Sequence, residues 1–451
     1  MSQPNTVNVK SFINERPMSG AQYALMFLCF LIVAADGIDV AIMGFIAPPI
    51  VQEWSITRAA FGVVMSAAPI GLVLGALIAG PSSDRFGRKK VLITSVLLFG
   101  VFTLITAFTS NSVEMAVMRL LTGLGLGAAM PNTTTLLSEY VPERSRSLFI
   151  TIMFTGFGVG SAGVGFAAAW LIPLYGWRSV LIMGGALPLV LLPFLLMFLP
   201  ESARFMVVRG FAPARIATTL GRVCRTTFAA GTTFFAPEPP VTTKRPIGVL
   251  FSRGYGLMTI SLWVTYFMGL LVIYLLTGWL PTLIKDAGLP IAAAANITAM
   301  FQTGGIVGAI LAGWLMDRVK PTWIISGAYV GGALCVLGVG ATGALSSSLA
   351  IWVLAAGFFM NGAQTGLNAF APNCYPTIAR ATGVSWMLGM GRFGSILGSG
   401  VGGLLLSLGW GFGGIVSALA IPAVLAAFAI LTSRVAAKEP VTTERTSLAH
   451  G

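Results

Sequence analysis

The sequence predicts an all-α membrane protein, with twelve transmembrane helices arranged as two pseudo-symmetric six-helix bundles. Three observations predict this class. Of the 451 residues, 56% are hydrophobic and only 9% are charged, whereas about a quarter of the residues in a soluble domain are charged. The apolar residues occur in runs of about twenty, the length that crosses a hydrocarbon core of roughly 30 Å. A polar, basic stretch at residues 200–254 divides these runs six and six.

Each apolar run is expected to form one helix, with ends placed to within a few residues. In chain order, the predicted helices cover about residues 22–46, 59–79, 91–110, 114–137, 147–171, 178–199, 255–280, 293–315, 321–341, 347–373, 382–406 and 411–433. The predicted parts of the chain are a cytoplasmic N-terminal segment at 1–21, a first bundle at 22–199, a cytoplasmic linker at 200–254, a second bundle at 255–433 and a cytoplasmic tail at 434–451.

The positive charges predict the topology. With both termini in the cytoplasm, the inner segments hold 22 Lys and Arg residues and the outer loops hold three. This is the bias of the positive-inside rule, and it explains the net charge of +13 without a nucleic-acid partner. The first twenty residues lack the apolar core and cleavage site of a signal peptide. We therefore expect a multi-pass protein in the lipid bilayer of the bacterial inner membrane.

The sequence predicts no metal, no cofactor and no enzyme. The only histidine, His450, lies one residue from the end, and the spacing of the four cysteines fits neither a metal site nor a disulfide framework. There is no Gly-x-Ser-x-Gly turn and no cluster of His, Asp and Glu. Any proton transfer must therefore use carboxylates.

One short motif occurs twice, after the second and after the eighth apolar run. Residues 80–85 and 313–318 both have the pattern Gly-x-x-x-Asp-Arg, and the first copy continues with Gly87 and Arg88. At these residues the sequence resembles the major facilitator superfamily. The resemblance implies the major facilitator fold, built from two parallel repeats, in which this loop belongs to a charge network that is remade as the halves rock. The alternative is a solvated polar turn.

The residues expected to act in gating are those of the two loops and a second cytoplasmic charge cluster at the end of the fourth helix. They are Gly80, Asp84, Arg85, Gly87, Arg88, Asp317, Arg318, Glu139 and Arg146.

A narrower resemblance begins in the first helix. Asp36-Gly37-Ile38-Asp39 looks like the Asp-Gly-x-Asp motif of the aromatic acid:proton symporter family, and residues 118–127, 199–205, 279–283 and 380–386 resemble it too. The likeness is greatest to 4-hydroxybenzoate/protocatechuate transporters, with benzoate and gallate carriers nearby. It implies proton-coupled import of a small aromatic carboxylate for aromatic hydrocarbon catabolism. We also expect the protein to act as a monomer.

Two departures bear on this resemblance. No histidine follows the second Gly-x-x-x-Asp-Arg loop, which leaves the identity of the aromatic acid open. Gly160 is followed by Ser161 and not by the proline of the superfamily's antiporter motif, which favours symport.

Asp36 and Asp39 carry the strongest physical signal. A charged side chain in mid-membrane costs at least about 2.5 kcal/mol on insertion scales, and two carboxylates three residues apart share a helical face and repel each other. Burial and repulsion both favour a bound proton. We therefore expect these residues to couple transport to protons; the alternative is that both lie near the outer end and are solvated.

Arg392 is the expected anchor for the substrate carboxylate. It lies deep in the eleventh helix, and its planar fork suits a carboxylate bidentately. It is expected to pair with Asp36 or Asp39 when no substrate is bound; the alternative is a structural ion pair. Arg119, near the start of the fourth helix, is a further binding candidate, with a structural role equally open.

The remaining candidates are polar or aromatic residues that suit a substituted ring. Asn361, Gln364 and Asn368 recur at helical spacing on one face, and amides both donate and accept hydrogen bonds. Tyr266 and Trp386, like Trp263 and Tyr274, could stack on the ring. The alternatives are interhelical hydrogen bonding for the amides and packing for the aromatic residues.

Two other functions remain open. Pro200-Glu201-Ser202 resembles a sugar-porter motif, but a neutral sugar gives no reason for Arg392. A membrane sensor of aromatic acids in chemotaxis is the other alternative.

Overall fold

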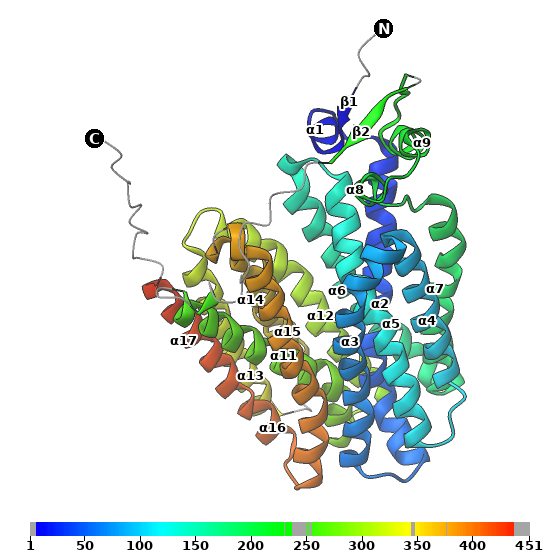
Figure 1. Cartoon of the computed structure of the whole chain (residues 1–451). Coiled ribbons are helices and arrows are strands. Elements are labelled where there is room, and N and C mark those ends of the chain that lie inside the picture. Colours follow the sequence, from blue (N-terminus) through cyan, green and yellow to red (C-terminus); the bar gives the residue numbers. More distant parts are fainter. Residues whose placement is uncertain are drawn as a thin grey trace.

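Long apolar helices form two halves that stand side by side (Figure 1). The computed structural model describes residues 6–229, 231–236, 250–251, 255–343, 348–375 and 377–436. The N-terminal half consists of α2 (Gly20–Glu53), α3 (Arg58–Phe86), α4 (Arg88–Thr106), α5 (Ser112–Tyr140), α6 (Glu143–Tyr175) and α7 (Arg178–Phe198). The C-terminal half consists of α11 (Gly256–Asp286), α12 (Ile291–Met316), α13 (Pro321–Thr342), α14 (Leu349–Phe370), a 3-10 turn η1 (Ala371–Cys374), α15 (Thr377–Ser407), α16 (Phe412–Ala418) and α17 (Ala420–Ala436).

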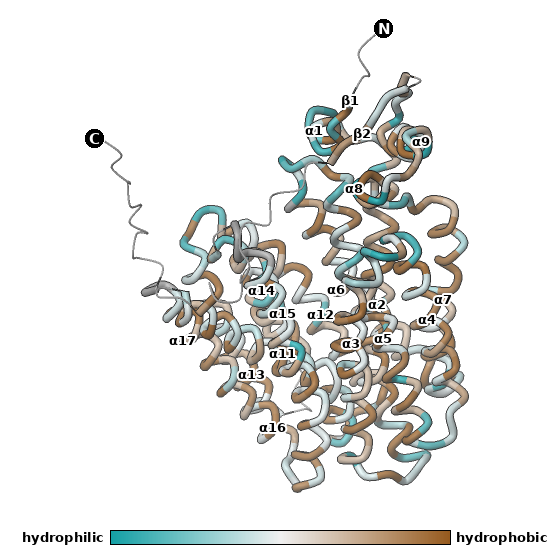
Figure 2. Tube along the Cα trace, viewed as in Figure 1, coloured by the Kyte–Doolittle hydropathy of each residue, from teal (hydrophilic) through white to brown (hydrophobic). Residues whose placement is uncertain are grey.

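Membrane-spanning length is a common property of these helices. Among the described residues, ten segments are long and apolar enough to cross a membrane, and one of them, Phe412–Ser433, joins α16 to α17. The 22-residue α14 and the 31-residue α15 bring the long segments to twelve. The side-chain amides of α14 lower its mean hydropathy. In Figure 2 the hydrophobic colour follows the middle of the helices, whereas hydrophilic residues gather near their ends.

Local sequence sets where several helices begin. Ser19 caps α2 in a capping box, in which its side chain accepts from the Gln22 amide and Gln22 bonds back to the Ser19 amide. Thr57 caps α3 and Asn111 caps α5 more simply, each through one side-chain oxygen that accepts from a backbone amide of the first turn. Gly87 ends α3 and starts α4 with φ +96°, a conformation that favours glycine. The chain therefore reverses here within a single residue.

The two halves repeat the same packing. In the N-terminal half α3 packs on α5, α2 on α6, and α4 on α5 and α7. In the C-terminal half the helices at the same positions pair alike: α12 on α14, α11 on α15, and α13 on α14 and α17. Small residues allow this, since a Cβ added to Gly123 of α5 would collide with the Ala68 carbonyl of α3. The predicted pseudo-symmetric pair of six-helix bundles is confirmed.

A small cap covers one end of the N-terminal half. It comprises β1 (Thr6–Asn8), α1 (Val9–Asn14), α8 (Ala203–Val208), α9 (Pro213–Cys224) and β2 (Thr233–Phe235), and β1 pairs in parallel with β2. We call this end of the molecule the terminal end, because α17 also finishes there (Figure 1), and the opposite end the far end. The segment between the halves thus contributes ordered structure that is tied to the start of the chain.

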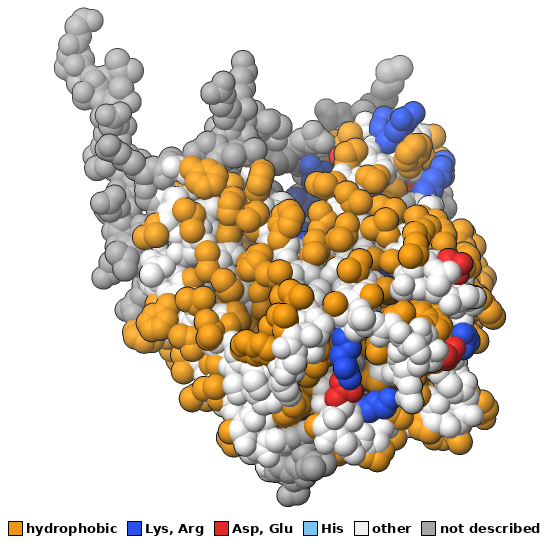
Figure 3. Space-filling view, turned by 90° about the horizontal axis from the view of Figure 1, so that it is seen from below, with side chains coloured by type: hydrophobic (Ala, Val, Ile, Leu, Met, Phe, Trp, Pro, Cys, Tyr) orange, Lys and Arg blue, Asp and Glu red, His pale blue; other side chains and the backbone are white. Residues whose placement is uncertain are grey.

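Contacts between the halves include a group at the far end. Arg58 forms an ion pair with Asp286 at 2.7 Å, the Lys285 ammonium donates to Gln52 at 3.3 Å, and Ser66 donates to the Ile396 carbonyl at 3.2 Å. Seen from this end, charged side chains of both signs lie in small groups among apolar ones (Figure 3). Toward the terminal end the ribbons of the two halves diverge (Figure 1). The halves are therefore fastened together at the far end in this conformation.

Candidate functional site

Asp39 of α2 lies in a closed cluster inside the N-terminal half. Its carboxylate accepts from both terminal nitrogens of Arg119 of α5, at 2.9 and 2.6 Å, and from the Thr103 hydroxyl of α4 at 2.6 Å. Both charged side chains are 1% exposed. This is the bidentate geometry that makes arginine–carboxylate pairs strong. Three helices are thus joined by one buried ion pair.

Asp36, one turn earlier on the same helix, has a different environment. It is 2% exposed, and its Oδ1 has no hydrogen-bond partner among the described residues. Arg392 of α15, in the opposite half, lies close enough to attract it electrostatically, but no ion pair joins the two within the described part of the chain. A buried carboxylate oxygen without a partner is costly. Such an atom marks a place where a proton or a ligand can bind.

Arg392 is partly buried and reaches toward the same region from the other half. It donates to the Tyr274 hydroxyl of α11 at 3.4 Å, and Tyr274 in turn lies near Asp36. Tyr266, eight residues or about two turns earlier on α11, is also near Arg392. The guanidinium therefore keeps free donors beside two phenol rings.

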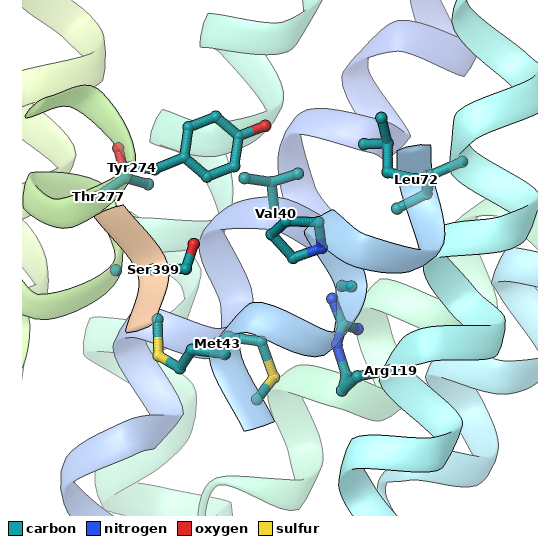
Figure 4. Close-up of a pocket in the computed structure, with 12 residues that line it drawn as sticks. Val40, Met43, Leu72, Arg119, Tyr274, Thr277 and Ser399 are labelled. Atoms are coloured by element: carbon teal, nitrogen blue, oxygen red, sulfur yellow. The ribbon is translucent and has the colours of Figure 1, made fainter. Parts of the chain in front are cut away.

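A cavity between the halves, which we call the central cavity, lies next to Tyr274 (Figure 4). The labelled lining residues of the N-terminal half are Val40, Met43, Leu72 and Arg119, and those of the C-terminal half are Tyr274, Thr277 and Ser399. The Tyr274 ring points toward Val40 across this space (Figure 4). The lining is mostly apolar with a few polar groups from both halves, as is typical of small-molecule sites.

The three amides predicted on α14 have three different surroundings. Gln364 is 6% exposed and accepts from the Tyr329 hydroxyl of α13 at 2.8 Å, while its Nε2 has no partner among the described residues. Asn361 bonds back to the Gly357 carbonyl at 3.3 Å and faces a second cavity between α6, α12 and α14. Asn368 is exposed but interacts with Tyr266, as Gln364 does.

Trp386 is 44% exposed and stacks on Trp263, with ring centroids 5.7 Å apart and an interplanar angle of 17°. These two rings contact each other and are absent from the lining of the central cavity. Of the aromatic candidates, Tyr266 and Tyr274 lie at Arg392, whereas Trp386 and Trp263 form a separate pair.

The first loop of the repeated motif is embedded in a polar network. Asp84, whose side chain is 74% exposed, pairs with Arg88 at 3.3 Å, and Arg88 also approaches Glu139 at 4.0 Å. Glu201, just before α8, accepts from the backbone amides of Lys89 and Ser202. The Ser202 hydroxyl donates to Glu139. The loop, α5 and the start of the cap are therefore joined through charged groups.

The other predicted gating residues are less connected. Asp317 and Arg318 are exposed, and the Arg318 guanidinium stacks over the Trp314 ring at 3.7 Å. Arg85 stacks over Phe86 at 5.2 Å, and Gly80 is exposed. Arg146 approaches Glu143 at 3.7 Å and does not pair with Glu139. Of the two loops, only the first takes part in ion pairs among the described residues, and Arg146 belongs to a separate group with Glu143 and Lys10.

Sequence reasoning did not identify several polar residues near the site. Thr103 bonds Asp39, Tyr329 bonds Gln364, and Gln302 of α12 donates to Thr277 at 3.1 Å. The signal for Gln302 was available, because it is one of two amides in an apolar helix, with Asn296. Thr103 and Tyr329 had none, since hydroxyls are common in membrane helices. No group of His, Cys, Asp and Glu within the described residues could hold a metal ion.

Comparison with known proteins decides the family. The sequence matches the Major Facilitator Superfamily over residues 28–388 and again over 297–450. The chain belongs to the major facilitator superfamily. A gallate transporter of Pseudomonas putida is 57% identical over 95% of this chain and 95% of its own. A 4-hydroxybenzoate transporter, PcaK, also of Pseudomonas putida, is 51% identical over 94% of this chain and 95% of its own.

A solved superfamily structure has the same fold. The xylose transporter XylE from Escherichia coli, in a partially occluded inward open conformation, matches with a TM-score of 0.71 over 91% of this chain and 97% of its own. The sequence identity is 18%, so this likeness concerns the fold alone. The predicted superfamily and membership of a multi-pass transporter class are confirmed.

Proposed function

We propose that the protein is a proton-coupled symporter that imports a small aromatic carboxylate across the bacterial inner membrane by alternating access. The relatives that are 57% and 51% identical transport gallate and 4-hydroxybenzoate by name, which supports an aromatic acid as substrate. Both have a carboxylate on a hydroxylated ring, so they need a cation, hydrogen-bonding partners and an apolar surface. Arg392 and its neighbours Tyr266 and Tyr274 would supply the first two, and the lining of the central cavity would supply the apolar surface.

One observation carries the proposal: Asp36 and Arg392 lie in opposite halves, near enough to attract each other, and neither takes part in an ion pair within the described residues. In the proposed binding step, the substrate carboxylate takes the free donors of Arg392. The negative charge then brought close to Asp36 favours a proton on its carboxyl. Substrate and proton therefore favour each other's binding. The proton removes the negative charge of Asp36 that would repel the substrate, and the substrate carboxylate pairs with Arg392.

The hydroxylated ring would lie among Tyr266, Tyr274 and the amides of α14. Gln364 keeps an unpartnered Nε2 beside Tyr266, which suits a ring hydroxyl. The apolar part of the ring would contact Val40, Met43 and Leu72, which line the central cavity. Arg392 favours a carboxylate over a sugar as the substrate, because a neutral ligand would leave its partly buried positive charge without a counter-ion.

We assign the terminal end to the cytoplasm on the basis of its lysine and arginine residues. The contacts at the far end then close the periplasmic side in this conformation. In the opposite state the Arg58–Asp286 pair would open, and the network around Asp84 and Arg88 would contact the C-terminal half. The polar loop is proposed as a latch between these states and not as a binding element.

The test is uptake of labelled gallate, 4-hydroxybenzoate and benzoate into cells that express the chain, with and without a protonophore. We expect accumulation of at least one acid, its abolition by the protonophore, and competition by the other acids but not by glucose. Accumulation that resists the protonophore would remove proton coupling. Uptake competed by glucose and not by benzoate would favour a sugar as the substrate.

A further inference from the structure

A third cavity lies at the terminal end, beneath the cap helix α9. It is enclosed by the first turns of α2, the start of α4, the last turn of α7 and one face of α9, and its free volume, open mouth included, is about 880 Å³. Its lining includes three cationic side chains: Lys89, Arg215 and Arg222. Glu201 is the one acidic residue there.

The positive charge of this cavity is only partly neutralised, because three cations surround the single carboxylate of Glu201. No ion pair within the described residues involves Lys89, Arg215 or Arg222, and Lys89 and Arg222 are close enough to repel each other. The Glu201 carboxylate is already engaged by the backbone amides of Lys89 and Ser202, at 3.1 and 2.9 Å. The cavity therefore has an excess of positive charge that an anion would relieve.

Two of the cations, Lys89 and Arg222, are held in place by the end of α7, whereas the Arg215 guanidinium lies over the Phe211 ring at 4.8 Å. The Lys89 ammonium donates to the Leu196 carbonyl, and Arg222 donates to the Met197 carbonyl, both at 2.9 Å. These are last-turn carbonyls, which lack partners within their own helix. Each cation uses one donor in this way and keeps others free. Arg215 lies seven residues before Arg222, two turns along the same face of α9.

One rim of the cavity, at Phe198, belongs to the exposed last turn of α7. Leu196, Met197 and Phe198 are 57%, 62% and 52% exposed, at the end of a helix that crosses the membrane. On its other face α9 buries Ile216, Leu220 and Val223 against the bundle. With the terminal end on the cytoplasmic side, as proposed above, the cationic face of α9 would lie near the headgroups of the inner leaflet, since it borders the end of a membrane-spanning helix.

We infer that this cavity binds the phosphate group of an anionic phospholipid, with Lys89, Arg215 and Arg222 around the headgroup and the acyl chains along the exposed last turn of α7. Basic pockets between membrane helices on the cytoplasmic side are suited to such headgroups. A bound lipid bridges α4, α7 and α9. It therefore fastens the cap to the N-terminal half, next to the loop that contains Asp84.

The experiment measures binding and thermal stability of the purified full-length protein in detergent with added phosphatidylglycerol. Parallel samples receive phosphatidylcholine or inorganic phosphate alone. We expect a saturable rise in the unfolding temperature with phosphatidylglycerol only. An equal rise with phosphatidylcholine or with inorganic phosphate would overturn the lipid assignment.

Variants localise the effect. Arg215→Gln with Arg222→Gln should weaken phosphatidylglycerol binding roughly thirtyfold, about fivefold for each arginine removed. Arg144→Gln with Arg225→Gln is the matched control: both are exposed arginines at the terminal end that do not line the cavity, and binding should stay as in the unaltered protein. Arg215→Lys with Arg222→Lys keeps the charge and should retain most of the affinity. Equal binding by the Gln pair and its control would overturn the proposal.

Discussion

Asp36 and Asp39 are separated by one turn of α2 and are both buried, yet their hydrogen bonds and ion pairs differ. Asp39 accepts three short hydrogen bonds and belongs to an ion pair wholly within the N-terminal half. Asp36 faces the other half, with one oxygen unpartnered among the described residues and a partly buried arginine nearby. We propose from this difference that the two acidic residues of one motif have different roles: Asp39 holds the helix in position, and Asp36 exchanges the proton.

The largest effect is expected from removing the partner of Asp39. Arg119→Leu leaves a buried carboxylate without its cation, which costs about 3–5 kcal/mol. We expect a large fall in the unfolding temperature in detergent and little protein in the membrane. Adding Asp39→Asn should restore most of the stability, since the uncompensated charge is gone. If Arg119→Leu were as stable as the unaltered protein, the structural role of the Asp39–Arg119 pair would be contradicted.

Asp36→Asn should abolish accumulation against a gradient without a comparable loss of stability, because no ion pair is broken. The amide keeps the size and polarity of the side chain but cannot carry the proton. Exchange of internal for external substrate should persist, since that exchange needs no net proton movement. Radiolabelled uptake and counterflow, measured on the same membranes, separate the two. Proton-driven accumulation by this variant would contradict the role of Asp36.

Arg392→Lys should weaken substrate binding tenfold or more, since hydrogen bonds to charged groups are each worth about 1.5–3 kcal/mol and an ammonium cannot form the bidentate fork. Arg392→Ala should be only slightly worse. Equilibrium binding of gallate or 4-hydroxybenzoate to the purified protein measures both. If Arg392→Lys retained its affinity, the positive charge of Arg392 would bind the substrate and the shape of its guanidinium would not matter.

The smallest effect is expected at the latch. Asp84 is exposed and its pair with Arg88 is worth no more than about 1 kcal/mol. Asp84→Asn should therefore lower the initial rate of uptake several-fold while substrate affinity stays unchanged. Arg88→Gln, which also loses the approach to Glu139, should be slower still. Loss of equilibrium binding in a folded Asp84→Asn protein would show that this loop does more than control the change of state.

The architecture could be predicted because the membrane imposes it. Apolar runs of fixed length, the charge bias and a repeated loop determine twelve helices in two similar bundles without knowledge of any single contact. The capped starts of α2 and α5 are also visible in the residues themselves, since Ser19 and Asn111 precede their helices. The split of the last segment into α16 and α17 was not foreseen, although the sequence carries a signal for it: Pro422 has no N–H for the Ala418 carbonyl, and its ring clashes with that carbonyl, where α16 ends.

The division between Asp36 and Asp39 could not be predicted. Sequence spacing places both on one face of α2, but which of them meets Arg119 depends on how α2, α4 and α5 are rotated about their axes. The same limit applies to α14, where regular spacing predicted a common role for three amides. Gln364 faces Tyr329 while Asn368 is exposed, because the surroundings of a helix change along its length.

The central proposal is that Asp36, and not Asp39, takes up the proton when substrate binds. It is tested by proton uptake in weakly buffered solution, followed with a pH indicator, as saturating substrate is added to the purified protein. We predict proton uptake by the unaltered protein, none by Asp36→Asn at a substrate concentration that still saturates it, and uptake retained by the stabilised pair Asp39→Asn with Arg119→Leu. Uptake that persists in Asp36→Asn and vanishes in the Asp39 pair would contradict the account.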